Sequence, residues 1–515
     1  MRTLIMILAG LIGLAIVAGV AILWLLKDPN QYKDQIETLI EENAGIQINI
    51  EGDLTWRLWP PIVLQAADLS FEDEETKYDL NSLSVHANAV ALLSTEPDLQ
   101  IQSLELNGLT MSDKRFDSVT EVVNLRLSDF ALNKPSPLHV EAISAPNSAE
   151  PTPFEMDAII TYRQDDDALD VTNAQFETAG IQGVCNAVVT YLSRSPTSNH
   201  AETADDLLPL DTFRAQDWDA TCDIPALDAG GLVLNNINIA TKNTGGRSTI
   251  NVNVPEFFDG SAALDVDLNA SRHSPRWKVK PDVNGADTQA VMAWLEQNLK
   301  WAAPLLFSGE FTMIGNTPND LIGSVSGNAK FDGGTGKIDI STIKESASTL
   351  ASLASTAGAS VLPELQEAIA KVAAWPDELD YSKLAGNWKI NGSQQTFDFA
   401  LDNLAINATG IADALTDKLD MRAELTFMDD PDLHSFDIAP ALQGIPIPVR
   451  CVGTMAEPDC GLDRGATQKL VTSVLRGQAG SKIQDAIADK VPDEYKDAAN
   501  DLLKGLFGGK KKKDE

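Results

Sequence analysis

The chain has 515 residues and a formal net charge of -36. This excess of acidic residues excludes nucleic-acid binding through a basic surface, because phosphate contacts need clustered Lys and Arg. It indicates a well-solvated surface, on which the like charges of neighbouring molecules repel one another. Hydrophobic residues make up 43% of the sequence, which is ample for a core. The length allows about two to four ordinary domains or one elongated domain.

The first segment, Leu4 to Leu26, contains no charged side chain. At about 1.5 Å of rise per residue, it is long enough to cross a hydrocarbon core of about 30 Å as one helix. We therefore predict a transmembrane anchor over residues 1–27 that includes Leu4, Trp24 and Leu26. A cleaved signal peptide and a buried core helix are the alternatives, but the apolar run is longer than either usually needs.

A short amphipathic helix is expected directly after the anchor. Asp28-Pro29-Asn30 supplies a cap and a proline suited to a first helical turn, and Gly45 provides a C-terminal stop. Between them, residues 31–43 place apolar side chains on one stripe: Tyr32, Ile36, Leu39 and Ile40. This helix would lie at the membrane surface, and its apolar stripe must pack against another part of the protein.

The pattern then changes to a period of two, which is typical of β-strands with one buried face. Its first apolar positions are Ile46, Ile48, Ile50, Leu54, Trp56 and Leu58. Similar alternation recurs in the segments 80–91, 99–109, 125–132, 158–162, 237–253 and 262–269. We predict a mainly β fold, a long antiparallel sheet with one apolar face. Alternation alone does not separate an open, curled sheet from a closed sandwich, and on that evidence the sandwich is favoured.

Helical patterns are expected at 287–301 and, rich in alanine, at 341–373, before strands resume at Phe397. The last sixty residues return to amphipathic helical patterns and end in lysines at 510–513. That tail would touch anionic head groups or remain a solvated end. The predicted segments are 1–27 (anchor), 28–110 (helix and first strands), 111–285 (variable β region), 286–465 (β region with helices) and 466–515 (helical end).

The four cysteines fall into two pairs, Cys185 with Cys222 and Cys451 with Cys460. The second pair flanks turn material, so a bridged hairpin is reasonable. No histidine lies beside any of them and there is no CxxC motif, which disfavours zinc and favours disulfides in an oxidising compartment. Free buried thiols are the alternative. Disulfides would place the bulk of the protein outside the cytoplasm.

No catalytic constellation is found, and the histidines have no metal-binding spacing. The Gly333–Lys337 stretch resembles a phosphate-binding loop, but Phe331 stands where glycine is required and Ile338 replaces the Ser or Thr. We therefore expect no enzyme activity, no cofactor and no metal site.

Asp265-x-Asp267-x-Asn269 opens like a calcium loop, but Ala270 replaces the required glycine and Arg276 stands in place of the bidentate acid. The acidic residues are better explained as side chains on the solvent-exposed face of a strand.

Several of these elements together resemble the AsmA family, inner-membrane-anchored periplasmic proteins of Gram-negative bacteria. The resemblance rests on the apolar anchor, on Asp28-Pro29-Asn30 with Tyr32, and on Gly52-x-Leu54-x-Trp56 followed by Pro60. A second, downstream similarity includes Ser308-Gly309, Gly315-Asn316, Asp332-Gly333, Gly336-x-Ile338 and Ile445–Val449. Residues 110–280 match no motif.

The resemblance implies a chorein-like start and a β-sheet curled into a hydrophobic groove of the bridge-like lipid-transfer type. Phospholipid would be the cargo and Ile46, Ile48, Ile50, Leu54, Trp56 and Leu58 would lie near the groove entrance. The N-terminus would be cytoplasmic and the bulk periplasmic, with an outer-membrane partner and a role in outer-membrane homeostasis. The alternative function is an assembly or scaffold factor for inserting outer-membrane proteins.

Overall fold

The computed structural model describes most of the chain between Pro29 and Leu462. The described ranges are 29–44, 48–57, 62–72, 76–87, 101–113, 118–146, 151–191, 206–272, 274–296, 300–341, 343–345, 348, 370–430, 432–433, 435–438, 443–455, 457–463 and 466. The predicted anchor with Leu4, Trp24 and Leu26, the predicted helical end, Ile46, Leu58 and most of 341–373 lie outside them. Within the described ranges, no helix is long and apolar enough to cross a membrane.

The chain divides into two compact units. Unit 1 comprises residues 1–286 and 308–325, and unit 2 comprises residues 287–307 and 326–515. Strand β17 (Pro304–Ile314) contributes its last seven residues to unit 1 and its first four to unit 2. Each unit is described by itself.

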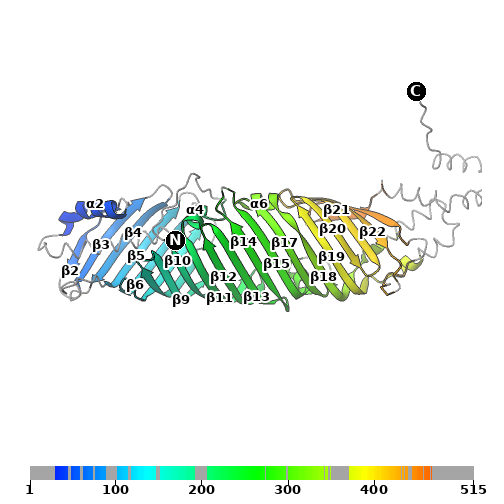
Figure 1. The fold of residues 1–515 in the computed structure, drawn as a ribbon, viewed down its shortest axis with the longest axis horizontal. Helices are drawn as coiled ribbons and strands as arrows, with labels where there is room; N and C mark the ends of the chain where they lie inside the picture. The colour runs from blue at the N-terminus through cyan, green and yellow to red at the C-terminus, as the bar shows by residue number, and fades with distance from the viewer. Residues whose placement is uncertain are drawn as a thin grey trace, which may run out of the picture. The chain divides into compact units, whose positions relative to one another are not determined.

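Unit 1 is a run of antiparallel strands with a few short helices (Figure 1). Its helices are η1 (Pro29–Tyr32), α2 (Lys33–Ala44), α4 (Leu210–Ala215) and α6 (Pro318–Ser324). Its strands are β1 (Ile48–Ile50), β2 (Leu54–Arg57), β3 (Ile62–Glu72), β4 (Thr76–Ala87), β5 (Ile101–Asp113), β6 (Ser118–Phe130), β7 (Ser136–Pro146), β8 (Thr152–Arg163), β9 (Ala168–Thr178), β10 (Ile181–Thr190), β11 (Asp217–Ala229), β12 (Leu232–Thr244), β13 (Arg247–Phe257), β14 (Gly260–Asn269) and β15 (Arg276–Asp287).

Antiparallel strand pairs build this sheet. The short strands β1 and β2 share one edge of β3, and from β3 to β15 every strand is hydrogen-bonded antiparallel to the next. No described pairing joins β1 or β2 to β15, so the sheet of unit 1 stays open. In Figure 1 the strands accordingly follow one another in chain order.

The period of two buries one face of this sheet. From β3 to β8, alternate apolar side chains are buried or partly buried and form a continuous core, with Leu106, Leu109 and Leu125 fully buried. Because successive side chains of a strand point to opposite faces, the intervening residues face solvent. The predicted apolar face is therefore present from β3 to β8.

Unit 2 repeats the arrangement. Its strands are β16 (Trp301–Ala302), β18 (Ser326–Asp339), β19 (Glu378–Asn391), β20 (Gln394–Leu401), β21 (Leu404–Asp413), β22 (Lys418–Phe427), β23 (Pro446–Gly453) and β24 (Pro458–Leu462), with helix α5 (Thr288–Trp294). β18 to β24 pair antiparallel in chain order, and β16 pairs with β18.

A loop closes over the core of unit 2 through buried polar contacts. The Asn403 side chain accepts a hydrogen bond from the Phe436 backbone N–H (3.1 Å) and donates one to the Phe436 carbonyl (2.9 Å). The Trp375 indole donates to the Asp437 carbonyl, and its ring packs on Phe427 and Phe436. These contacts seal the aromatic cluster at one end of the apolar face.

Several predicted elements agree with the structure and others need correction. The helix expected at 31–43 is present, although it opens as the 3-10 turn η1 before α2. The segment 237–253 is two strands, because Thr244-Gly245-Gly246-Arg247 turns the chain and both glycines have positive φ. The helix expected at 287–301 ends at Trp294, and Trp301 instead pairs with Ile338 in the sheet.

Truncating a central core side chain should destabilise unit 1. We expect Leu106→Ala to lower the free energy of unfolding by about 2 to 5 kcal/mol, because the residue is fully buried and its neighbours cannot fill the space. Denaturant unfolding of the full chain measures the change. The matched control is Gln102→Ala on the exposed positions of β5, which should cost less than about 0.5 kcal/mol. Equal losses in both variants would contradict the assignment of the faces.

Candidate functional site

The four predicted entrance residues that the structure describes lie at the first edge of the unit 1 sheet. Ile50 and Leu54 are almost fully buried, at 4% and 1% exposed, and Ile48 and Trp56 pack partly buried against the same core. Ile48 and Ile50 stand opposite Phe71 and Leu69 of β3. Leu54 and Trp56 stand opposite Ala66 and Leu64 of the same strand. All four therefore lie on one face despite the break between β1 and β2. Their role at an entrance stays a prediction.

Helix η1 is tied to this edge by one asparagine. The Asn30 side chain accepts a hydrogen bond from the Leu54 backbone N–H (2.9 Å) and donates one to the Leu54 carbonyl (3.2 Å). Seven residues further on, Glu37 of α2 accepts a hydrogen bond from the Ile50 backbone N–H (2.8 Å). Gly52 lies between these contacts, where a Cβ would approach the Ala67 carbonyl oxygen to 2.5 Å. The helix and the first two strands are thus built as one piece.

Two rows of mostly apolar side chains cross β10 to β15 on the inner face. We call them the apolar rows. The first consists of Ala187, Ala220, Thr241, Ile250, Val266 and Val279, and the second of Cys185, Cys222, Ile239, Val252, Leu264 and Pro281. In contrast to the core of β3 to β8, most of these side chains are only partly buried. An apolar surface that is partly accessible to solvent is therefore present here.

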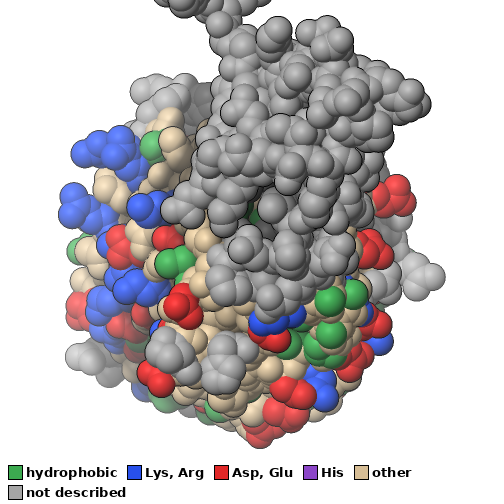
Figure 2. Space-filling view, turned by 90° about the vertical axis from the view of Figure 1, so that its right-hand side faces the viewer, with side chains coloured by type: hydrophobic (Ala, Val, Ile, Leu, Met, Phe, Trp, Pro, Cys, Tyr) green, Lys and Arg blue, Asp and Glu red, His purple; other side chains and the backbone are tan. Residues whose placement is uncertain are grey.

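The opposite face of the same strands is polar and paired. Asn238 donates to Asp223 (2.7 Å), Asn251 donates to Asp265 (2.6 Å), and Lys242 forms an ion pair with Asp219 (3.0 Å). The acids of the rejected calcium motif thus stand on the wet face of β14, as their alternation indicates. Figure 2 views the molecule from the right-hand side of Figure 1, and acidic and basic side chains are interspersed on the coloured part of that surface as well.

Helix α4 covers one margin of the apolar rows. Leu210 of the helix packs with Leu268, and Phe213 meets Trp218 edge to face at 4.6 Å. The row beneath contains two buried polar residues: Asn243 donates to the Phe213 and Gln216 carbonyls, and its side-chain oxygen accepts from Ser248. Every polar atom of this pair is thereby used within the fold, and the open surface begins one row further on.

Both cysteine pairs form disulfides between directly opposite residues of neighbouring strands. Cys185 and Cys222 join β10 to β11, and Cys451 and Cys460 join β23 to β24. Cys185 and Cys222 belong to the second apolar row, so the bond lies on the inner face. The predicted pairing is confirmed in both cases.

Unit 2 carries a comparable apolar face. Trp388 and Phe397 stand opposite each other and stack with an interplanar angle of 1°, partly exposed beyond the buried core. The same row continues through Ala408, Ala423 and Val449. The downstream strands therefore offer the same kind of surface as β10 to β15.

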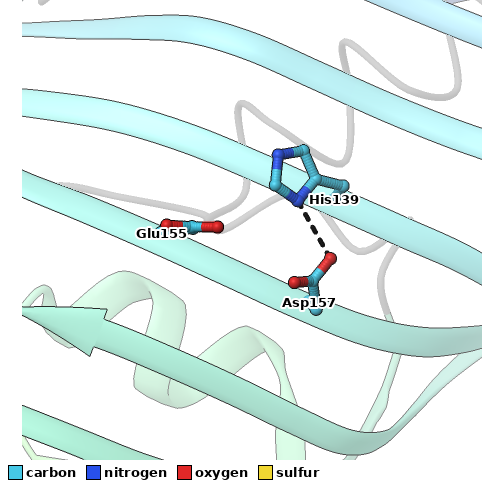
Figure 3. A group of neighbouring side chains, drawn as sticks. All are labelled: His139, Glu155 and Asp157. Carbon is cyan, nitrogen blue, oxygen red and sulfur yellow. Dashed lines mark hydrogen bonds and ion pairs between the residues drawn. The ribbon is translucent and has the colours of Figure 1, made fainter.

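One group of titratable side chains stands out on the outer face of unit 1 (Figure 3). It joins His139 of β7 with Glu155 and Asp157 of β8, and their ligand atoms all lie within 4.8 Å of one another. The hydrogen bond from the imidazole to Asp157 (2.9 Å) raises the pKa of His139, and Glu141 adds to the rise while partial burial opposes it. On the β6 side, Arg126 is paired with Glu105 at 3.2 Å.

The comparisons with known proteins address the first part of the chain. Residues 1–159 match the model of the AsmA family. The resemblance seen in the sequence is thereby confirmed over this range; no curated protein and no solved structure matches the chain.

The structure explains why the residues of the AsmA resemblance occur together. Asn30 and Leu54 are 24 positions apart, yet they exchange two hydrogen bonds, and Gly52 allows the chain to pass close to β3 between them. Helix and strand positions of the motif thus form a single contact. The apolar rows lie beyond the matched range.

Sequence reasoning found these apolar rows only in part. The alternation of β12 to β14 was visible, but β9, β10, β11 and β15 were not among the predicted strands. Strand β11 could have been predicted from its alternation of apolar and other residues, in which the apolar positions are Trp218, Ala220, Cys222 and Ile224. The His139 group depends on strand register, which no local pattern reveals.

Removing either disulfide should destabilise its unit, more so for the longer loop. Replacing Cys185 and Cys222 by serine should lower the free energy of unfolding by about 3 to 4 kcal/mol, and the same change at Cys451 and Cys460 by about 2 to 3 kcal/mol. The difference follows from sequence separations of 37 and 9 residues. Denaturant unfolding with and without reductant measures it; reduced wild-type protein is the control. No loss in the first double variant would contradict the prediction.

His139 should titrate above about pH 6.5, the value of an unperturbed histidine. A raised pKa means that protonated His139 stabilises the fold below that pH, and that this contribution is lost as the pH rises through the folded-state pKa. Imidazole resonances of chelator-treated protein, followed by NMR against pH, measure it. Asp157→Asn should lower the pKa because it removes the main partner. An unchanged titration in that variant would refute the assignment.

Proposed function

We propose that the protein binds acyl chains of phospholipid on its apolar face and conducts lipid along it between membranes, in support of outer-membrane assembly and homeostasis. The observation that carries the proposal is the pair of apolar rows, which present partly exposed Ile, Val and Leu side chains on adjoining strands. No chemical step is part of this function, and it needs no cofactor.

The energetics favour a lipid over water on this face. Each methylene that leaves water contributes about 0.8 kcal/mol, and apolar protein surface gains about 25 cal/mol for each Å² covered. Charged head groups would remain in water at the open side. Curling of the sheet around the chains, as a groove, belongs to this proposal, and the open strand order permits it.

The membrane arrangement is also proposed. Residues 1–27 would anchor the protein in the inner membrane with a cytoplasmic N-terminus, and the bulk would lie in the periplasm. Two disulfides support an oxidising compartment, because such bonds are rare where thiols are kept reduced. The tie of η1 to β2 would then hold the first sheet edge near the anchor, where lipid would enter.

A charge on the apolar rows should abolish lipid binding. Val252→Asp places a carboxylate among the acyl chains, and its desolvation should reduce co-purified phospholipid about tenfold or more. Lipid mass spectrometry on full-length protein extracted with its membrane measures the effect. The matched control is Asn253→Asp, the next residue on the exposed face of β13, which should retain wild-type lipid. Ile48→Asp tests the entrance in the same way.

Circular dichroism and thermal unfolding must show that the variants remain folded. Val252→Ser, which adds no charge, should lose lipid only in part. A photocrosslinking residue at position 252 identifies the occupant: lipid adducts support the conduit. Unfolded outer-membrane protein as the dominant adduct would support the assembly-factor alternative instead. Wild-type lipid content in Val252→Asp would overturn the proposal.

A further inference from the structure

Strand register gathers four carboxylates and one imidazole on the outer face of unit 1. His139 stands directly opposite Asp157, and two residues along the same strands Glu141 stands opposite Glu155. On the next strand, β9, Glu177 stands opposite Glu155. The side chains of these five residues project from the polar face, away from the apolar core.

The row of Glu141, Glu155 and Glu177 is unfavourable by itself. Like charges directly opposite on neighbouring strands destabilise a sheet. Glu177 accepts a hydrogen bond from the Gln182 amide (3.0 Å), and Glu141 lies 3.4 Å from His139. Among the described residues, no hydrogen bond or ion pair is found for the Glu155 carboxylate. A cation held at this place would relieve the repulsion.

The two ring nitrogens of His139 have different partners. Nδ1 faces Asp157 at 2.9 Å and Nε2 lies 3.4 Å from Glu141, while the Glu155 carboxylate lies within 4.8 Å of the ligand atoms of His139 and Asp157. A metal-binding histidine typically presents one nitrogen to the metal and donates its other N–H to a carboxylate, which fixes the ring. Nδ1 with Asp157 and Glu155 would supply the ligands, and Glu141 would orient the imidazole.

We propose that His139, Asp157 and Glu155 bind a divalent transition-metal ion of the zinc class. One imidazole and two carboxylates suit zinc and its neighbours better than calcium or magnesium, which prefer oxygen ligands alone. The ligand atoms are already within 4.8 Å of one another, and the exposed carboxylates can rotate to the roughly 2 Å bonds that zinc requires. Three protein ligands leave a coordination position open to solvent.

The nearby cation does not block the site. Arg126 stands opposite His139 on β6, and its guanidinium is engaged with Glu105 of β5. Arg126, His139 and Asp157 also line a shallow pocket of about 210 Å³, which gives an ion and its water room to enter. The site lies on the face opposite the apolar core, so it is independent of the proposed lipid function.

Zinc titration of the chelator-stripped full chain, in competition with a chromophoric chelator at physiological salt, tests the proposal. Wild-type protein should show one tight site per chain, and His139→Ala, Asp157→Asn and Glu155→Gln should each weaken it at least about tenfold. Glu141→Gln should weaken it less, since it acts through the imidazole. The controls are His86→Ala, a histidine on β4 outside the cluster, and Asp265→Asn, an acid of another outer-face pair.

A second readout separates ligation from loss of fold. Zinc should raise the thermal unfolding midpoint of wild-type protein but not that of His139→Ala, and X-ray absorption of the loaded protein should show one imidazole ligand. Excess magnesium should not displace the zinc. Zinc bound with equal affinity by wild type and His139→Ala would overturn the proposal, as would spectra that show oxygen ligands alone. In either case the acidic surface binds cations only diffusely.

Discussion

The structure depends on one constraint, the antiparallel pairing of each strand from β3 to β15, and from β18 to β24, with the next strand. Because side chains alternate strictly along a strand, a register that is kept from one pair to the next lines up residues of like character in rows. From β10 to β15 this produces rows such as Ile239, Val252 and Leu264 on one face and Asp223 with Asn238 on the other. A slip of one residue in any pair would exchange the two faces for that strand.

The two faces follow different chemistry. Along the apolar rows of the inner face most side chains are hydrocarbon, so a bound molecule would meet mainly shape and apolar character. On the outer face the contacts are specific pairs of acids with amides or cations, and they spread the large negative charge of the chain over many partners. The His139 group differs from these pairs because acids outnumber their partners there.

Much of this could be read from the sequence, and the failures have physical causes. The helix before β1, the first strands and both cysteine pairs were predictable, because caps, alternation and paired spacing are local signals. Boundaries failed where a tight turn interrupts an unbroken alternation, as at Gly245 and Gly246. The parity of β3 shifts at Asp68, which has a φ of 49°, and no local pattern announces such a change. Contacts such as Asn30 with Leu54, or His139 with Asp157, are set by pairing across the sheet.

The polar pair beneath α4 has a consequence for anything that lies on the inner face. Asn243 and Ser248 occupy the row next to the apolar rows, and helix α4 covers that row. Neighbouring rows are about 6.6 Å apart along a strand. The polar, covered row would therefore form a barrier at one margin of the apolar rows. A flexible hydrocarbon chain would lie across the strands, from one β-strand to the next, and would not extend along a strand past this margin.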